Sequence, residues 1–262
     1  MISETILIMH NIEPVDGIFN YKFSKKVPLI NQIQNSSNIV FTISEEEVKE
    51  KICKFIEGFT IKIEESLIEP AEEQSRILAR NLKNIITIKS TMPTEIYLQD
   101  YRSIPRGGTA SIGKSTRTSF SIEGSIQNLN LNDPNIQSII NSNEQDSLKY
   151  QFLSKGILHY YYDNNVDCIR ELFKLIENND SFPNYYKYQV LRHLFSHPPP
   201  YHKTTINLFA SEFSTTSFEY NTYDVPNRTI IINIESQNSK KELERLTSNL
   251  ISQLRKDLNL ES

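Results

Sequence analysis

Tryptophan is absent from this chain of 262 residues, and cysteine, methionine and glycine are scarce, with two, three and seven copies. Cys53 and Cys168 lie far apart and lack CxxC-type spacing, so we expect neither a disulfide framework nor a metal cluster, and a reducing compartment fits best. The few glycines have no collagen-like period, while isoleucine, tyrosine and phenylalanine are abundant. These features predict a globular chain rather than a fibrous or disordered one.

Long apolar runs are also missing. No segment approaches the roughly 18 apolar residues of a membrane helix, and the first residues do not resemble a signal peptide, so we expect a cytoplasmic protein without a membrane partner. Acidic and basic residues nearly balance, which gives a net charge of -4. Because this charge does not attract nucleic acid globally, any such binding has to use a local basic patch.

The first half of the chain mixes strand and helix patterns. Two helices are predicted, one from the capping box of Ser44 and Glu47 through Ile52 and Phe55, the other from Pro70 onwards. Period-two alternation or β-branched runs predict strands at residues 5–11, 19–23, 38–44, 59–63, 85–88, 96–101 and 116–122. We therefore expect an α+β protein in which residues 1–137 form a mixed α/β domain of unknown role, with a mostly antiparallel sheet.

The second half shows helical periodicity after an Asn-rich segment, residues 127–143, which we interpret as a linker. A β-like run at residues 228–235 precedes a last helix, which Ser239 and Glu242 cap and which bears a leucine stripe. Apolar residues recur at helical spacing over residues 147–162, 166–176, 184–196 and 204–213. This pattern predicts a C-terminal helical domain over residues 138–262.

One of these helices ends in side chains suited to phosphate chemistry: Arg192, His193 and His197, followed by Pro198. The guanidinium group of Arg192 is a permanent planar cation that matches phosphate oxygens, whereas histidine exchanges protons near neutral pH. Pro198 disfavours α geometry at His197, so we expect the helix to end there, where the negative end of its dipole favours imidazolium. Such a group can hold and cleave a phosphodiester without a metal.

The order Arg192-His193-Leu194-Phe195-Ser196-His197 resembles the signature of the HEPN superfamily: an arginine, a polar residue, three further residues and a histidine. Catalytically active members of that superfamily are metal-independent ribonucleases built as helical bundles, and their arginine and histidine usually line a cleft between two copies of the domain. The resemblance covers about residues 147–213 and implies a HEPN-like bundle, RNA as the partner, a homodimer, and neither cofactor nor metal. It assigns phosphate binding to Arg192, acid–base catalysis to His197 and a supporting role to His193.

Two other interpretations of this segment stay open. A HEPN-like module without catalytic activity would dimerise or bind a nucleotide or a partner protein. In the purely structural alternative, Arg192 caps a surface helix while the histidines pack beside Tyr188 and Phe195. A histidine metal site completed by His202 is not expected, because prolines 198–200 intervene and no matching carboxylate or cysteine lies close in sequence.

A second motif lies in the first half, where Gly108 to Ser115 matches the phosphate-loop pattern G-x-x-x-x-G-K-[ST]. A working phosphate loop needs a strand before it and a helix directly after it, because the helix N-terminus supplies amides to the phosphates. Residues 116–122 instead alternate as a strand does. A protein that binds an NTP through this loop is therefore the less favoured alternative.

The same stretch is basic, since residues 102–119 contain no Asp or Glu. Its side chains and amides can bind phosphates without NTPase activity, and the flanking Tyr101 and Phe120 can stack on unpaired bases. A solvated hairpin loop is the alternative. The residues predicted to contact phosphate or nucleic acid are Arg102, Arg106, Lys114 and Arg117.

Overall fold

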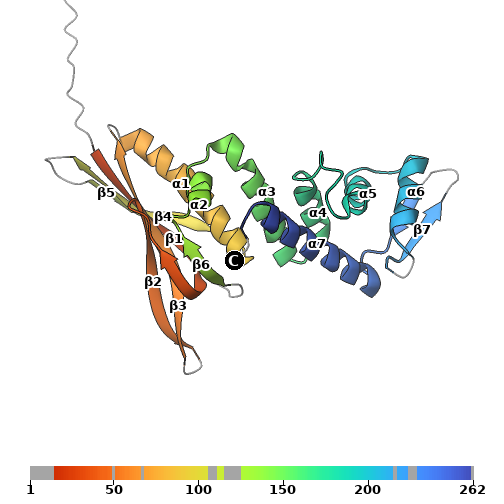
Figure 1. Ribbon diagram of the computed structural model, residues 1–262, viewed down its shortest axis with the longest axis horizontal. Coiled ribbons are helices and arrows are strands. Elements are labelled where there is room, and N and C mark those ends of the chain that lie inside the picture. The colour runs from red at the N-terminus through yellow and green to blue at the C-terminus, as the bar shows by residue number, and fades with distance from the viewer. Residues whose placement is uncertain are drawn as a thin grey trace, which may run out of the picture. The chain divides into compact units, whose positions relative to one another are not determined.

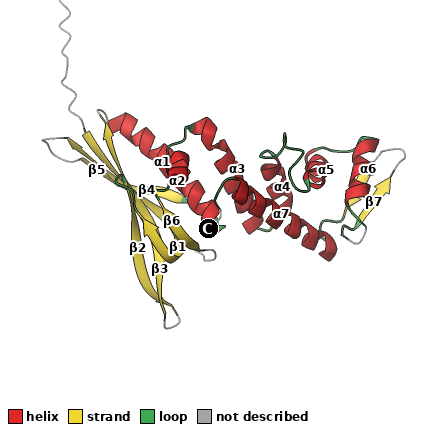
Figure 2. Ribbon diagram, viewed as in Figure 1, coloured by secondary structure: helices red, strands yellow, loops and turns green. Residues whose placement is uncertain are grey.

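The computed structural model describes residues 15–48, 51–65, 68–105, 111–114, 125–214, 217–223 and 229–260. The fold is α+β, with an antiparallel sheet of several strands and, among the described residues, seven helices (Figures 1 and 2). The described residues form two compact units: residues 15–83 with 94–141, here the sheet unit, and residues 84–93 with 142–260, here the helical unit. The strands predicted at 5–11 and 116–122 lie outside the described residues.

A strand of 20 residues, β1 (Val15–Gln34), organises the sheet unit. It pairs antiparallel with β3 (Lys51–Glu65) on one side and with β4 (Ile96–Pro105) on the other. A short strand, β6 (Ile126–Asn130), pairs with β1 in parallel. One strand therefore connects segments from three separate parts of the sequence.

Two further strands extend this sheet. β2 (Ile39–Val48) pairs with β3, and β5 (Ser111–Lys114) pairs with β4, which gives the order β2-β3-β1-β4-β5 (Figure 2). The antiparallel sheet is confirmed. So are the strands predicted at residues 19–23, 38–44, 59–63 and 96–101.

Aromatic residues form the core of the sheet unit. Phe59 of β3 is buried, and its ring centroid lies 5.3, 5.6 and 6.0 Å from those of Tyr21, Phe23 and Phe41. The helix α1 (Ile68–Ser90) is joined to β1 by a hydrogen bond of 2.9 Å between the hydroxyls of Tyr21 and Ser75. Burial raises the pKa of Tyr21. Because each ring removes a large apolar area from water, these contacts fix which strand faces are buried.

The strands β1 and β3 approach each other closely at Gly58, which pairs with Lys22. The register of the two strands shifts between Lys22 and Val27. A Cβ atom at position 58 would overlap the carbonyl oxygen of Tyr21. Glycine is therefore required where this irregularity begins, because no side chain fits between the two backbones.

Two predicted elements of the first half are wrong. The helix expected from Ser44 is a hairpin of β2 and β3, in which Ile43 pairs with Ile56 and Glu47 with Ile52. The capping-box spacing is a local signal, and cross-strand pairing overrides it. The strand expected at residues 85–88 belongs to α1, because a short, fully buried run of β-branched residues has no periodicity that distinguishes helix from strand.

The Asn-rich segment of residues 127–143 is not a linker, because it contains β6 and the helix α2 (Pro134–Ile140). The carboxylate of Asp133 caps α2 by accepting hydrogen bonds from the amides of Asn135 and Ile136, at 2.8 and 3.2 Å. Asn81 of α1 donates a hydrogen bond of 3.0 Å to the carbonyl oxygen of Ile140. Polar residues that mark loops also cap helices, so composition alone misled the interpretation.

The helical unit contains five whole helices and a two-stranded hairpin among its described residues. α4 packs against α3, α5 and α7, and α5 also packs against α6 (Figure 1). The elements are α3 (Glu144–Tyr161), α4 (Asn165–Phe173), α5 (Tyr185–Ser196), α6 (Lys203–Glu212), α7 (Gln237–Asp257), β7 (Tyr220–Tyr223) and β8 (Thr229–Ile232). The helices predicted at 147–162, 184–196 and 204–213, the last helix and the β-like run are confirmed.

Two helix boundaries in this unit differ from prediction. The helix expected over residues 166–176 ends at Phe173 and continues as turns. The last helix starts three residues earlier than expected, because Ser236 rather than Ser239 is its N-cap and accepts a hydrogen bond of 3.3 Å from the amide of Ser239. Helix ends depend on which of several serines the surrounding structure places at the cap.

Three contacts hold α4 and α5 in the helical unit. Tyr188 of α5 is 1% exposed and donates a hydrogen bond of 3.1 Å to the carbonyl oxygen of Leu246 in α7, and burial raises its pKa to about 12. The hydroxyl of Thr247 in α7 donates to Oδ1 of Asn165 in α4 at 2.7 Å. α3 meets α4 at Gly156, where a Cβ atom would overlap the side chain of Leu172. These contacts fix the two helices that carry the candidate site.

Candidate functional site

The three candidate catalytic residues lie on or just after α5. This helix follows Asn184, which has a left-handed backbone with φ of 60°, and it ends at Ser196. His197 is the C-cap with extended backbone, φ -126° and ψ 139°, and its amide donates a hydrogen bond of 3.1 Å to the carbonyl oxygen of His193. The predicted helix end before Pro198 is confirmed, because proline restricts the preceding residue to extended geometry.

His193 and His197 form a pair one helical turn apart. Their ring centroids are 4.8 Å apart, and the ring planes are inclined by 42°. His193 is half-buried, and this burial, followed by the charges of His197 and Arg192, lowers its pKa from the usual 6.5. His197 is exposed. The pair therefore presents a ring that is mostly neutral at pH 7 beside a second ring that faces solvent.

Tyr201 fixes the backbone around this pair. Its buried hydroxyl lies 3.2 and 3.1 Å from the carbonyl oxygens of Leu194 and His197, which share its one proton in a bifurcated hydrogen bond. The centroid of its ring lies 6.2 Å from that of His193. Burial raises the pKa of the Tyr201 hydroxyl, so it remains a donor. Two carbonyl groups at the helix end are thus satisfied by one side chain, which holds His197 in place.

Arg192 points from α5 toward the turn that follows α4. Its Nη2 atom lies 3.5 Å from Oε1 of Glu177, and its guanidinium carbon lies 5.9 Å from the centroid of the Phe173 ring. The side chains of Arg192 and Glu177 are 36% and 50% exposed. An ion pair with such exposure contributes only about 0–1 kcal/mol. The phosphate oxygens of a ligand can therefore replace Glu177 at this guanidinium group.

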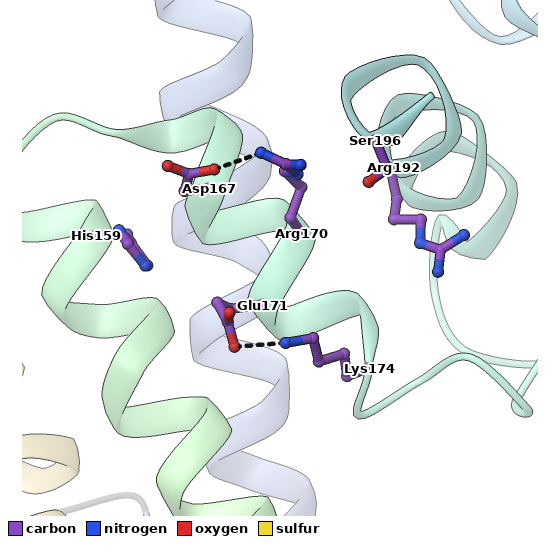
Figure 3. A pocket seen from close by; sticks show the side chains of 7 residues that line it. All are labelled: His159, Asp167, Arg170, Glu171, Lys174, Arg192 and Ser196. Atoms are coloured by element: carbon purple, nitrogen blue, oxygen red, sulfur yellow. Dashed lines mark hydrogen bonds and ion pairs between the residues drawn. The ribbon is translucent and has the colours of Figure 1, made fainter. Parts of the chain in front are cut away.

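A cavity of about 440 Å³ lies in the helical unit, beside α5 (Figure 3). In Figure 3 the α4 side chains lie between His159 of α3 and the two residues from α5. Three cations and two carboxylates face it, together with an imidazole and a hydroxyl group. Such a lining suits a charged ligand rather than an apolar one. The lining residues are His159, Asp167, Arg170, Glu171, Lys174, Arg192 and Ser196.

Ion pairs along α4 organise one wall of the cavity. Nη1 of Arg170 lies 2.9 Å from Oδ1 of Asp167, and Nζ of Lys174 lies 2.9 Å from Oε2 of Glu171 (Figure 3). A hydrogen bond from the side chain of Asn164 is the main cause that lowers the pKa of Asp167, with Arg170 adding to it against the effect of burial. The carboxylates of this wall are therefore engaged by neighbouring donors.

The structure separates the candidate catalytic residues onto two faces of α5. Arg192 and Ser196 line the cavity, whereas His193 and His197 do not, because one residue turns an α-helix by about 100°. Arg192 is still close enough for its charge to lower the pKa of His193. Sequence reasoning missed the α4 wall of the cavity. The signal that could have found it is the charge recurrence at spacings of three and four from Asp167 to Lys174.

The basic residues predicted to bind phosphate belong to the β4–β5 region. Arg102 is exposed on β4, opposite Ile112 of β5. Lys114 lies on β5, opposite Asp100 of β4, and thus on a strand, whereas a phosphate loop has its lysine at the start of a helix. Arg106 and Arg117 lie outside the described residues.

Comparisons of the chain with family models, with curated proteins and with solved structures found no match. Within the described ranges, no helix combines the length and the apolar character needed to cross a membrane. In the same part of the chain, no group of three or more His, Cys, Asp or Glu side chains is arranged to hold a metal ion. The α5 residues and the adjacent cavity are the chemical features that define the candidate site.

Proposed function

We propose that the protein is a metal-independent endoribonuclease of the HEPN type that acts through the residues of α5. The observation that carries this proposal is the His193–His197 pair at a helix end, with one ring half-buried, the other exposed, and Arg192 beside them. Two imidazoles in unequal environments supply the base and the acid that phosphodiester cleavage requires. The packed helices α3 to α7 support the bundle that the motif's resemblance implies.

In the proposed reaction, neutral His193 accepts the proton of an RNA 2′-hydroxyl group while the 2′-oxygen attacks the adjacent phosphorus atom. His197 in its imidazolium form donates a proton to the 5′-oxygen as the P–O5′ bond breaks. Arg192 compensates the negative charge that develops on the phosphate oxygens. The products are a 2′,3′-cyclic phosphate and a 5′-hydroxyl group, and the step consumes neither water nor metal.

The unequal burial of the two rings supports this assignment. A general base has to be neutral at the working pH, and burial lowers the pKa of His193 as that role requires. The exposed ring of His197 exchanges its proton with solvent between turnovers. The proposal includes a homodimer, as the HEPN resemblance implies, with the RNA held in the cleft between two copies.

A second candidate function is RNA or nucleotide binding without catalysis. The observation that favours it is the position of Arg192, which lines the cavity with Ser196 while the two histidines lie on the neighbouring face. In this function Arg192 binds phosphate through charge alone, and the histidines have no chemical role.

Cleavage of an unstructured RNA in the presence of EDTA tests the proposal. We expect the wild-type protein to cut it, and His193→Ala and His197→Ala to lower kcat/KM about 10²- to 10⁴-fold. His202→Asn is the matched control, because His202 is an exposed histidine at the N-cap of α6 and asparagine also caps helices, so it should cut as the wild type does. A wild-type protein that leaves the RNA intact, or a His197→Ala variant of full activity, rules out the nuclease and leaves the second candidate.

A further inference from the structure

We infer that the cavity lined by α3, α4 and α5 binds a backbone phosphate of the RNA strand next to the scissile one. The cavity would then be a subsite that positions the substrate and that gives the enzyme a requirement for more than one phosphate. This inference rests on the proposed nuclease function and names how the same site holds its substrate. Three observations support it: Arg192 belongs to both the cavity and the proposed catalytic site, the cavity lining carries more positive than negative charges, and the cavity lies beside the histidine pair.

Arg192 connects the two parts of the site. Its side chain lines the cavity, and its backbone is adjacent to His193, so the cavity and the histidine pair lie on neighbouring faces of one helical turn. A strand that passes over this turn with one phosphate at the histidines brings the neighbouring phosphate toward the cavity. The hydroxyl of Ser196, one turn after Arg192, adds a neutral donor to the same wall.

The charge of the lining favours an anion. Arg170, Lys174 and Arg192 contribute three positive charges against the two carboxylates of Asp167 and Glu171. Each carboxylate already has a cation at 2.9 Å on its own helix, whereas Arg192 is paired at 3.5 Å with a half-exposed glutamate from the turn after α4. The scissile phosphate can therefore replace this glutamate at Arg192 at a small cost, as the proposed reaction requires, whereas the neighbouring phosphate is held by Arg170 and Lys174, whose side chains are 43% and 44% exposed.

Binding of a ligand that cannot be cleaved tests the cavity apart from catalysis. A fluorescently labelled DNA oligonucleotide lacks the 2′-hydroxyl group, and its Kd can be followed by anisotropy over a range of salt. We expect Lys174→Gln to raise Kd roughly 3- to 10-fold and to lower the salt slope by about 0.7, the value for one phosphate contact on a single strand. Lys240→Gln is the control, because Lys240 is an exposed lysine on α7 paired with Glu235, outside the cavity lining.

A substitution that removes a negative charge from the cavity, rather than a positive one, distinguishes a binding role of the α4 wall from a structural role. Glu171→Gln keeps the shape of the side chain and removes one negative charge from the cavity, so it should lower Kd by roughly 3-fold. A purely structural α4 wall predicts instead that Lys174→Gln and Glu171→Gln both leave Kd unchanged or both weaken binding, and either result overturns the inference. Inorganic phosphate and AMP serve as competitors: if they bind and the oligonucleotide does not, the cavity takes a free phosphate ligand and the inference is again overturned.

Substrate length distinguishes failure of this inference from failure of the nuclease proposal. An RNA dinucleoside monophosphate has only the scissile phosphate, so Lys174→Gln should leave its kcat/KM unchanged while raising KM for a longer RNA. If the wild-type protein cuts both RNAs and Lys174→Gln affects neither, the cavity inference fails and the nuclease stands. If no RNA is cut but the two substitutions move Kd for the oligonucleotide in opposite directions, the nuclease fails and the phosphate-binding cavity stands.

Discussion

The sheet unit and the helical unit distribute their charged side chains in different ways. In the sheet unit the interior is apolar and aromatic around Phe59, and the candidate phosphate ligand Arg102 stands exposed on a single strand. In the helical unit, side chains from three helices face one cavity, and two histidines of α5 stand beside it. Convergence of charges, rather than their number, therefore marks the candidate site.

The difference follows from the geometry of the two kinds of element. Alternation along a strand places successive side chains on opposite faces, so a strand such as β4 gives each polar residue a separate position. A helix brings residues three and four apart onto one face, and packing of α4 against α3 and α5 adds the faces of its neighbours. Three helices can therefore surround a ligand with groups that are far apart in sequence.

The largest difference between the two units is expected in the pH dependence of cleavage. Since the base has to be neutral and burial lowers the pKa of His193, we expect kcat/KM to rise up to tenfold per pH unit through a value below 6.5, to reach a plateau, and then to fall, because the reaction also needs a protonated general acid. His193→Ala should remove the rising limb and lower the plateau about 10²- to 10⁴-fold. Arg102→Gln, in the sheet unit, should keep the wild-type profile; a change of that profile would place part of the site in the sheet unit.

The next largest effect is the loss of stability on substitution of one closely packed glycine in each unit. Gly58→Val forces a side chain against the carbonyl oxygen of Tyr21, a backbone atom, so we expect a loss of about 3 kcal/mol in the free energy of unfolding. Gly156→Ala meets the side chain of Leu172, which can move, and alanine favours the helix, so the net loss should be about 1 kcal/mol. Hydrogen exchange of peptides from β1 and from α3 measures each loss, and equal losses would contradict the distinction between backbone and side-chain neighbours.

The smallest effect is the loss of stability on removal of one buried tyrosine hydroxyl from each unit. Tyr21→Phe and Tyr188→Phe each remove one hydrogen bond and should cost about 1 kcal/mol at pH 8. Folding raises the pKa of Tyr188 from 10.0 to about 12, so the folded state holds this proton more tightly and stability falls as pH rises above 10, by up to about 1.4 kcal/mol per pH unit. Urea unfolding at pH 8 and at pH 11 should show that Tyr188→Phe loses less stability on this change than the wild type. An equal loss would mean that Tyr188 does not carry the alkaline sensitivity.

Much of the fold could be predicted where its determinants are local. The apolar faces of α3, α5, α6 and α7 recur at helical spacing, and β1 and β4 show alternation, so their positions follow from a few residues at a time. The hairpin around Ser44 could not be predicted in this way, because its strands are specified by pairs such as Ile43 with Ile56. The end of α1 buries polar residues such as Asn84 and Thr87 together with its isoleucines, so the sequence shows no separate polar face from which a helical period could be recognised.

In the candidate site, too, only the residues whose determinants are local could be predicted from the sequence. The sequence identifies Arg192, His193 and His197 because they lie within six consecutive residues, and Pro198 indicates the helix end. The cavity could not be predicted, since its α3 and α4 residues reach Arg192 only through tertiary packing, such as the close contact of Gly156 with Leu172. The different burial of the two histidines is likewise a property of the packed helices.

The partners of the long strand β1 leave the ribosome at different times. Its last partner in the sheet, β6, is synthesised roughly a hundred residues after β1 itself, which takes a ribosome on the order of 5–20 s. During that time β1 has only part of its neighbours, although its aromatic side chains have already left the ribosome. The helical unit has a wait of similar length, because α4 packs against α7, whose Thr247 follows its hydrogen-bond partner Asn165 by 82 residues. The two units differ instead in what waits: in the sheet unit it is a strand with part of its edge unpaired, which is the element more prone to aggregation in a nascent chain.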